Sequence, residues 1–211
     1  MMIENNILIL LGYDYFKSLE KIINKKNIFC FIYKDYIKYF NSKNLQKLKD
    51  IMGTNLIISG ELKPLIAEII EQKRIDCLVT LGWRRILDLK DFEKVGLMVN
   101  VHPALLPEYK GYHPVPYVIL NEEKVHGITA HLINEEVDAG DIIQKESFPI
   151  NTFSTLRSLQ YEVNKRMPEF LRKLFDKIIE GNIDYSPNMD ADTITIAPIR
   201  THKDSEVYLN E

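Results

Sequence analysis

Four short, mostly apolar runs occur in the first half of the chain. They occupy positions 7–11, 28–33, 56–59 and 77–81. A strand that is buried on both faces of a parallel sheet has this character, whereas a half-exposed strand alternates apolar and polar residues. Parallel neighbours require a crossover, and the stretches between the runs have helical spacing and room for a helix of roughly 10–15 residues. The pattern predicts an α/β fold with a central, mostly parallel sheet flanked by helices.

The remaining elements follow from capping residues and periodicity. We expect helices after Asp14, over 35–49 and from Pro64, strands at 97–102 and 127–134, and an extended segment at 141–150 that pairs at the sheet edge.

The longest helix is expected over 154–180, closed by Gly181, and Pro168 inside it should kink or divide it. The chain beyond Asn182 is polar and rich in turn residues, with 193–196 as its one strand-like piece. This predicts one domain over 1–181 with a C-terminal extension over 182–211.

Composition narrows the class of protein. Hydrophobic residues make up 45% of the 211 residues, enough for a sizeable core, and the formal net charge is −3. Nucleic-acid binding proteins usually carry a basic excess, so no nucleic-acid partner is expected. No stretch approaches the ~18 apolar residues of a membrane span, and the N-terminus lacks a signal-peptide pattern, which favours a cytoplasmic protein. Cys30 and Cys77 are expected to be buried, reduced thiols.

Polar side chains that suit acyl transfer gather in the middle of the chain. If the strand at 97–102 is extended, Asn100 and His102 point to one face, and Thr129 and His131 share a face of the next strand in the same way. Asp138 follows in a turn.

An amide can donate to an oxygen that becomes negative, an imidazole can move a proton near neutral pH, and a carboxylate can orient that imidazole. Each residue also has a purely structural explanation. A histidine can lie at a sheet edge, an asparagine can tie down a loop and an aspartate can start a turn. The residues alone leave both interpretations open.

Two longer motifs resemble the signatures of the folate-dependent formyltransferases. The stretch from Asn100 to Gly111 reads NVHPALLPEYKG, where the family usually has N-x-H-P-S-L-L-P followed by a basic residue and glycine. DAGDI, starting at Asp138, resembles the second signature D-x-G-x-I, at a spacing that suits the family. HGITAH at 126–131 and GWRRIL at 82–87 resemble the connecting strand and the loop that precedes the first signature. Ala104 replaces the common serine.

This resemblance implies a Rossmann-like formyltransferase fold and roles for particular residues. Asn100 would hold the formyl oxygen, His102 would transfer the proton of the acceptor amine, and Asp138 would pair with His102. The formyl donor would be 10-formyltetrahydrofolate. The residues expected to line its pterin pocket are Arg85, Ile86, Leu87 and Val137, and those expected to support the catalytic group are Thr129 and His131.

The acceptor amine is the next question, because family members formylate glycinamide ribonucleotide, methionyl-tRNA or nucleotide-linked amino sugars. The ribonucleotide enzyme usually has a Gly/Ser/Asn-rich loop after its first strand, whereas here 12–16 reads GYDYF and places Asp14 where a phosphate would lie. The tRNA enzyme normally carries a sizeable C-terminal RNA-binding domain, and about 60 residues follow Ile150 here. A hydrolytic branch usually carries an N-terminal regulatory domain.

The sugar branch resembles the chain best. GYHPVPY at 111–117 is similar to its post-signature loop, typically G-W-H-P followed by an aromatic residue. This implies a nucleotide-linked 4-amino sugar as acceptor and a place in lipopolysaccharide or O-antigen biosynthesis. Tyr112, His113 and Tyr117 would border the acceptor pocket, or would only pack the loop against the core. Glycinamide ribonucleotide or another small amine is the alternative acceptor.

Two further expectations concern partners. In similar proteins the region after the second signature binds nucleotide or forms a homodimer, and 198–204 resembles a common C-terminal segment of the family. A non-catalytic nucleotide- or folate-binding module is the alternative from another class, although no G-x-G-x-x-G follows the first strand. The histidine spacings match no usual metal-ligand pattern, so no metal is expected.

Overall fold

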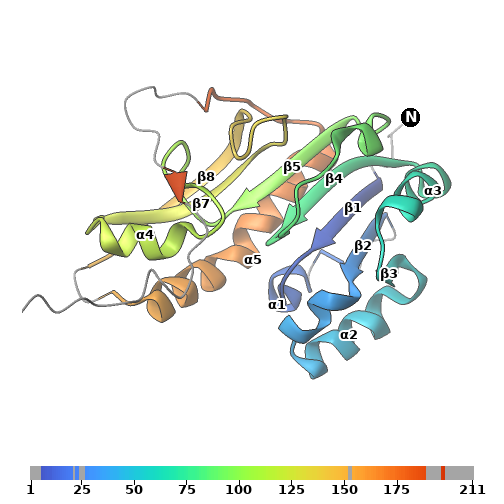
Figure 1. Ribbon diagram of the computed structural model, residues 1–211, viewed down its shortest axis with the longest axis horizontal. Helices are drawn as coiled ribbons and strands as arrows, with labels where there is room; N and C mark the ends of the chain where they lie inside the picture. Colours follow the sequence, from blue (N-terminus) through green and yellow to red (C-terminus); the bar gives the residue numbers. More distant parts are fainter. Residues whose placement is uncertain (1–5, 21, 24–26, 152–153, 189–195, 198–211) are drawn as a thin grey trace, which may run out of the picture.

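A single seven-stranded sheet forms the centre of the protein (Figure 1). The computed structural model describes residues 6–20, 22–23, 27–151, 154–188 and 196–197. The strand order is β3-β2-β1-β4-β5-β7-β8. The five parallel strands are β1 (Asn6–Leu11), β2 (Ile28–Tyr33), β3 (Leu56–Ser59), β4 (Ile75–Leu81) and β5 (Leu97–His102). The antiparallel strands are β7 (Val125–Leu132) and β8 (Ile142–Pro149). The predicted mostly parallel sheet is confirmed.

Helices cover the sheet. They are α1 (Phe16–Leu19), α2 (Ser42–Met52), α3 (Lys63–Lys73), α4 (Pro114–Leu120) and α5 (Leu156–Glu180), with 3-10 turns η1 (Lys34–Tyr39), η2 (Gly53–Asn55) and η3 (Leu89–Phe92). The long α5 lies behind the centre of the sheet in Figure 1, with α1 packed against it. Its core face includes Phe170, Leu171, Leu174 and Phe175, each fully buried. Among the described residues, no helix combines the length and apolar character that crossing a membrane requires.

Three local predictions differ from the structure. The helix expected over 35–49 is divided into η1 and α2, because the Asn41 side chain accepts hydrogen bonds from the N–H groups of Lys43 and Asn44 and starts a new helix. The segment 111–117, expected as a loop, contains the start of α4, with Pro114 in its first turn. Pro168 does not divide α5, which runs unbroken from Leu156 to Glu180.

The chain after α5 returns to the sheet. Ser186 forms a bridge with Ile142 at the start of β8, and β9 (Ile196–Ala197) pairs in parallel with β6 (Lys110–Gly111) as a second, two-stranded sheet. The expected strand at 193–196 is described only at Ile196, and 198–204 lies outside the described residues. The division of the chain at residue 181 stays a prediction.

The carboxyl ends of β1 and β4 are in direct backbone contact. The Gly12 N–H donates to the Leu81 carbonyl at 2.9 Å, and a Cβ at Gly12 would lie 1.8 Å from the carbonyl oxygen of Gly82. Any side chain at position 12 must therefore push the two strand ends apart. This contact sets the relative positions of Tyr13 and Arg84, which follow the two glycines.

We expect Gly12→Ala to lower the free energy of unfolding by about 1–3 kcal/mol, because the clash is between backbone atoms that cannot rotate away. Urea denaturation is the measurement. Gly60→Ala is the matched control, since a Cβ there meets nothing within 4 Å. Equal stabilities of the two variants would contradict the close contact of β1 and β4.

Candidate active site

The predicted polar residues meet at the boundary between the parallel and antiparallel parts of the sheet. In the antiparallel pairing of β5 with β7, Asn100 is opposite His131 and His102 is opposite Thr129. Residues directly opposite each other project from the same face of a sheet. One face therefore carries the amide, both imidazoles and the threonine hydroxyl, as the alternation in the sequence predicted.

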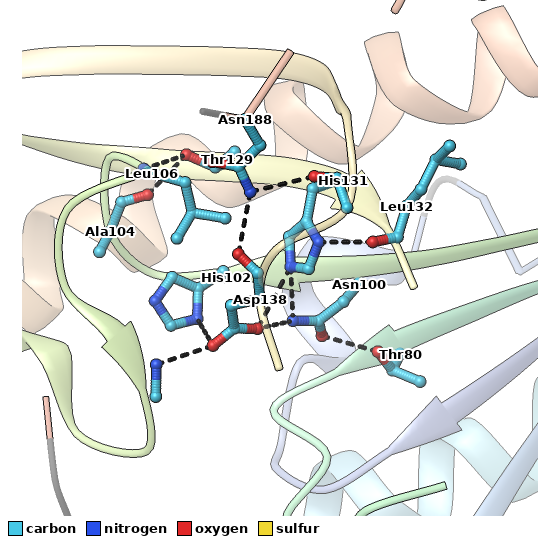
Figure 2. A network of polar contacts seen from close by, with 12 residues as sticks. Thr80, Asn100, His102, Ala104, Leu106, Thr129, His131, Leu132, Asp138 and Asn188 are labelled. Carbon is cyan, nitrogen blue, oxygen red and sulfur yellow. Dashed lines mark hydrogen bonds and ion pairs between the residues drawn. The ribbon is translucent and has the colours of Figure 1, made fainter. Parts of the chain in front are cut away.

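Asp138 is the centre of this group (Figure 2). Its Oδ1 accepts a hydrogen bond from Asn100 Nδ2 at 3.0 Å and lies 3.3 Å from His131 Nε2. Its Oδ2 accepts from the Gly111 backbone N–H at 2.9 Å and lies 3.4 Å from His102 Nδ1. The backbone of Asp138 is left-handed, with φ of 53°. The side chain is 9% exposed, so the carboxylate exchanges water for these donors.

Burial and neighbours compete over the charge states here. Burial raises the pKa of Asp138, but the positive charge that His102 can carry, the contact with His131 and the hydrogen bond from Gly111 outweigh burial and lower this pKa to about 2. Burial also lowers the pKa of His102, against the attraction of Asp138 and the Tyr109 carbonyl. At neutral pH the site therefore holds an ionised Asp138 beside a neutral His102, and the ion pair forms only when His102 gains a proton.

The orientation of His102 indicates where that proton goes. His102 Nε2 lies 2.9 Å from the Tyr109 carbonyl, a hydrogen-bond distance that requires a proton on Nε2. Tyr109 adopts a left-handed backbone, with φ of 58°, and its hydroxyl donates to Glu123, which anchors the loop. The neutral ring therefore turns the lone pair of Nδ1 toward Asp138. Nδ1 is the nitrogen at which a further proton is both accepted and stabilised.

Asn100 is held by three partners. Its Oδ1 accepts from the Thr80 hydroxyl at 2.7 Å, and its Nδ2 contacts His131 Nε2 at 3.1 Å as well as Asp138. His131 Nδ1 in turn lies 2.7 Å from the Leu132 carbonyl. Rotating the amide would set its oxygen against the carboxylate, so the network determines which way the amide faces.

Thr129 supports the loop after β5 and does not touch the carboxylate. Its hydroxyl donates to the Ala104 carbonyl at 2.7 Å and accepts from the Leu106 N–H at 3.2 Å. Because position 104 contributes its backbone oxygen and a buried methyl group, the departure from serine leaves this contact intact.

The sequence assigned no role in the site to several residues that the structure places there. Thr80 lies beside Asn100 in the β4–β5 pairing, and Tyr109 and Gly111 contribute backbone atoms. Asn188, 2% exposed, donates through Nδ2 to the carbonyls of Asp138 and Gly140 at 2.9 and 3.0 Å. These contacts join distant parts of the chain, which only the fold brings together. No group of three or more metal-ligating side chains occurs among the described residues.

The four residues expected around the pterin do not take part in the Asp138 network. Among the described residues, none of their side chains forms a hydrogen bond or ion pair with Asp138. The Arg85 guanidinium lies over the Tyr33 ring at 4.1 Å and 3.7 Å from Asp35. Ile86 is 88% exposed and Val137 is 55% exposed. Leu87 is half-buried against the core.

Tyr112 belongs to a cluster that the sequence did not predict, which we call the Arg84 cage. The Arg84 guanidinium lies 5.6, 5.0 and 5.3 Å from the ring centres of Tyr13, Tyr39 and Tyr112, and Arg84 Nε donates to the Tyr112 hydroxyl at 2.5 Å. Within the described residues, Arg84 has no carboxylate within ion-pair distance. The cage therefore presents a positive charge that is not neutralised.

The other two expected acceptor residues lie close by in sequence. The His113 ring packs edge-on against the Tyr112 ring, with 4.4 Å between the ring centres, whereas Tyr117 packs against the core. Asp14 lies just before α1, where the sequence predicted the start of a helix. Its carboxylate accepts hydrogen bonds from the N–H groups of Phe16 and Asn41 and from Asn44 Nδ2, which ties the turn after β1 to the start of α2.

The lowered pKa of Asp138 predicts how stability depends on pH. A carboxylate whose pKa is about 2 when folded and near 4 when unfolded stabilises the fold above about pH 4, and this contribution is lost as the pH falls through 2. The stability advantage of the wild type over Asp138→Asn should therefore shrink between about pH 4 and pH 2. Urea unfolding at several pH values measures it, with the exposed Asp141→Asn as the control. If the stability difference between the wild type and Asp138→Asn stays constant from about pH 4 to pH 2, the contacts assigned to the Asp138 carboxylate are wrong.

Comparison with known proteins agrees with this geometry. Residues 37–174 match the family model described as "Formyl transferase". A methionyl-tRNA formyltransferase of Halalkalibacterium halodurans is 33% identical over 134 residues, which are 63% of this chain and 42% of the relative. The chain thus spans less than half the length of this relative.

Two solved structures share the fold. A 4-N formyltransferase from Francisella tularensis superposes with a TM-score of 0.74 at 21% identity, over 98% of this chain and 82% of that one. An N-formyltransferase from Helicobacter canadensis, in complex with folinic acid and dTDP-3-aminofucose, gives 0.73 at 23% identity, over 92% and 71%. Since the family model covers more than half of the sequence, including Asn100, His102 and Asp138, the chain belongs to the formyl transferase family.

Proposed function

We propose that this chain transfers the formyl group of 10-formyltetrahydrofolate to the amine of a nucleotide-linked amino sugar. The observation that carries the proposal is the buried Asp138 carboxylate, which holds an amide and two imidazoles around one point in a chain of the formyl transferase family. This set of groups suits direct attack of an amine on an acyl carbon.

His102 is the proton-transfer group in this proposal. The transfer forms a bond between the acceptor nitrogen and the formyl carbon and breaks the bond to the donor nitrogen, so the acceptor must lose a proton and the donor nitrogen must gain one. His102 Nε2 is engaged by Tyr109, which leaves Nδ1 to receive the proton. Asp138 Oδ2, 3.4 Å away, stabilises the imidazolium until the proton passes on.

Asn100 stabilises the charge that develops on the formyl oxygen. Both of its N–H groups have partners, Asp138 Oδ1 and His131 Nε2. One of them must exchange its partner for the formyl oxygen, and the bond to the imidazole nitrogen of His131 is weaker than the bond to the Asp138 carboxylate. Thr80 keeps the amide from rotating during this exchange.

Folate supplies the formyl group, and the loop after β4 has a suitable surface for its flat ring. Exposed apolar side chains favour an apolar ligand, and Ile86 and Val137 are both exposed to solvent. We propose that these two residues, with Arg85 and Leu87, hold the pterin. A related structure supports a folate donor, since the Helicobacter canadensis enzyme was solved with folinic acid.

The Arg84 cage supports a nucleotide on the acceptor. A guanidinium without a carboxylate partner suits a phosphate, and the aromatic residues Tyr13 and Tyr112, 43% and 37% exposed, suit a base. Tyr112 directly follows Gly111, whose N–H binds Asp138, so the cage borders the candidate active site. The Helicobacter canadensis enzyme, in complex with dTDP-3-aminofucose, supports the same acceptor class.

A second candidate is formylation of methionyl-tRNA, because several sequence relatives are methionyl-tRNA formyltransferases. The net charge of −3 speaks against an RNA acceptor, because phosphate contacts usually require a basic surface. A cytoplasmic location and a homodimer remain part of the proposal.

The direct test is release of tetrahydrofolate from 10-formyltetrahydrofolate with a panel of acceptors. We expect turnover with nucleotide-linked amino sugars and none with glycinamide ribonucleotide or methionyl-tRNA. Asn100→Ala, His102→Ala and Asp138→Asn should each lower kcat/KM at least ~100-fold, because each removes a group that acts on developing charge. Asp141→Asn, in the same turn, should retain wild-type turnover.

Turnover with methionyl-tRNA alone would favour the second candidate. Binding of folate without turnover of any acceptor would indicate a non-catalytic folate-binding protein. If the chain shows no folate binding and no turnover, the proposed function is wrong.

Replacement of Arg84 tests the nucleotide part separately. We expect Arg84→Met to raise KM for the nucleotide-linked acceptor at least ~10-fold with little change in kcat, because the phosphate contact does not change during the reaction. Arg157→Met on α5, an exposed arginine with the same change of charge, is the control. An unchanged KM in Arg84→Met would remove the cage from acceptor binding.

A further inference from the structure

We propose that Asn188 is a positioning residue of the candidate active site, because its amide holds the turn that aims the Asp138 carboxylate at Asn100 and His102. Asn188 lies beyond the residues that match the formyl transferase family, which end at 174. The catalytic consequence rests on the proposed function, whereas the positioning itself does not.

Asn188 uses both N–H groups of its side-chain amide to bind the turn that contains Asp138. Its Nδ2 has two hydrogens, and it donates to the Asp138 carbonyl at 2.9 Å and to the Gly140 carbonyl at 3.0 Å (Figure 2). The opposite orientation of the amide would place its oxygen against both carbonyls, so the donor side must face the turn. One buried side chain thus grips the backbone at Asp138 itself and two residues later.

The turn has little freedom to move elsewhere. Asp138 is in the left-handed region, and a Cβ at Gly140 would lie 2.1 Å from the Leu132 carbonyl oxygen. The turn is therefore packed closely against the end of β7. The amide of Asn188 adds the hydrogen bonds that keep the carbonyls of this unusual backbone satisfied.

A second segment after α5, strand β9, contacts Gly111, whose backbone N–H also holds the Asp138 carboxylate. Ala197 in β9 pairs with Gly111 in β6, and the Ala197 carbonyl accepts from the Tyr112 N–H at 3.0 Å. Gly111, with φ of 110°, has room only for hydrogen, since a Cβ would lie 2.6 Å from the Ala197 oxygen. The Gly111 N–H then donates to Asp138 Oδ2. In Figure 1 β9 is the short red arrow beside the loop before α4.

The energetics of Asn188 separate positioning from simple stabilisation. Its Oδ1 is buried and has no partner among the described residues. A buried amide with an unsatisfied acceptor gains little net stability from its two hydrogen bonds. The main effect of these bonds is on where the Asp138 turn lies.

The test compares Asn188→Asp and Asn188→Leu with the wild type. Asp has the same shape but cannot donate when ionised, and Leu has a similar size without polar atoms. The exposed Asn182→Asp, on the same segment, is the matched control. The measurements, on the full chain, are thermal unfolding, the NMR shift and hydrogen exchange of the Gly111 amide, and kcat and KM with the acceptor of the panel.

We expect both Asn188 variants to fold, to shift the Gly111 amide signal and to speed its exchange at least ~10-fold, because the carboxylate no longer accepts from it in a fixed position. We expect kcat to fall at least ~10-fold while KM changes less than ~3-fold. Asn182→Asp should match the wild type in every measurement.

An unchanged kcat in a folded variant overturns the proposal. If the wild type turns over no acceptor, the proposed function fails, but the positioning role is still tested by the NMR signal and hydrogen exchange of the Gly111 amide. An unchanged signal in folded variants overturns the positioning role. If neither variant folds, Asn188→Ser, which keeps one donor, is measured by the same criteria. Loss of folding in all three variants also overturns it, since Asn188 is then required for the fold as a whole.

Discussion

The hydrogen bonds that converge on the Asp138 carboxylate are the interaction on which the rest of the candidate site depends. A carboxylate removed from water is tolerated only when donors replace the solvent, and here Asn100 and Gly111 donate to it, while the imidazoles of His102 and His131 lie within 3.4 and 3.3 Å. Because one charge is shared by all of these groups, the amide and both imidazoles are oriented together. The same charge makes Nδ1 of His102 a favourable place for a proton.

The fold supplies this arrangement at the point where the sheet changes direction. Ligand sites of α/β proteins usually lie at the carboxyl ends of parallel strands. Here β5 ends the parallel part, and the antiparallel β7 and β8 turn back beside it, which brings the Asp138 turn over the end of β5. The Arg84 cage stands at the carboxyl ends of β1 and β4, whose contact at Gly12 permits no side chain.

Family and acceptor rest on different kinds of observation. Membership of the formyl transferase family follows from residues 37–174, which contain Asn100, His102 and Asp138. The acceptor depends on the periphery, where Arg84 and its three tyrosines favour a nucleotide. Asp14, which the sequence sets against a phosphate at the end of β1, ties the turn after β1 to α2 by accepting hydrogen bonds from Asn41 and Asn44.

The sequence by itself determined the parallel sheet, the shared face of Asn100 and His102 and the family signatures, because strand burial and side-chain alternation are local properties. It could not show that Thr80 holds the Asn100 amide, that the Tyr109 carbonyl occupies Nε2 of His102, or that Asn188 grips the Asp138 turn. These contacts join residues up to 50 positions apart. Only the tertiary structure decided them, since a hydrogen bond between distant segments leaves no periodic trace in the chain.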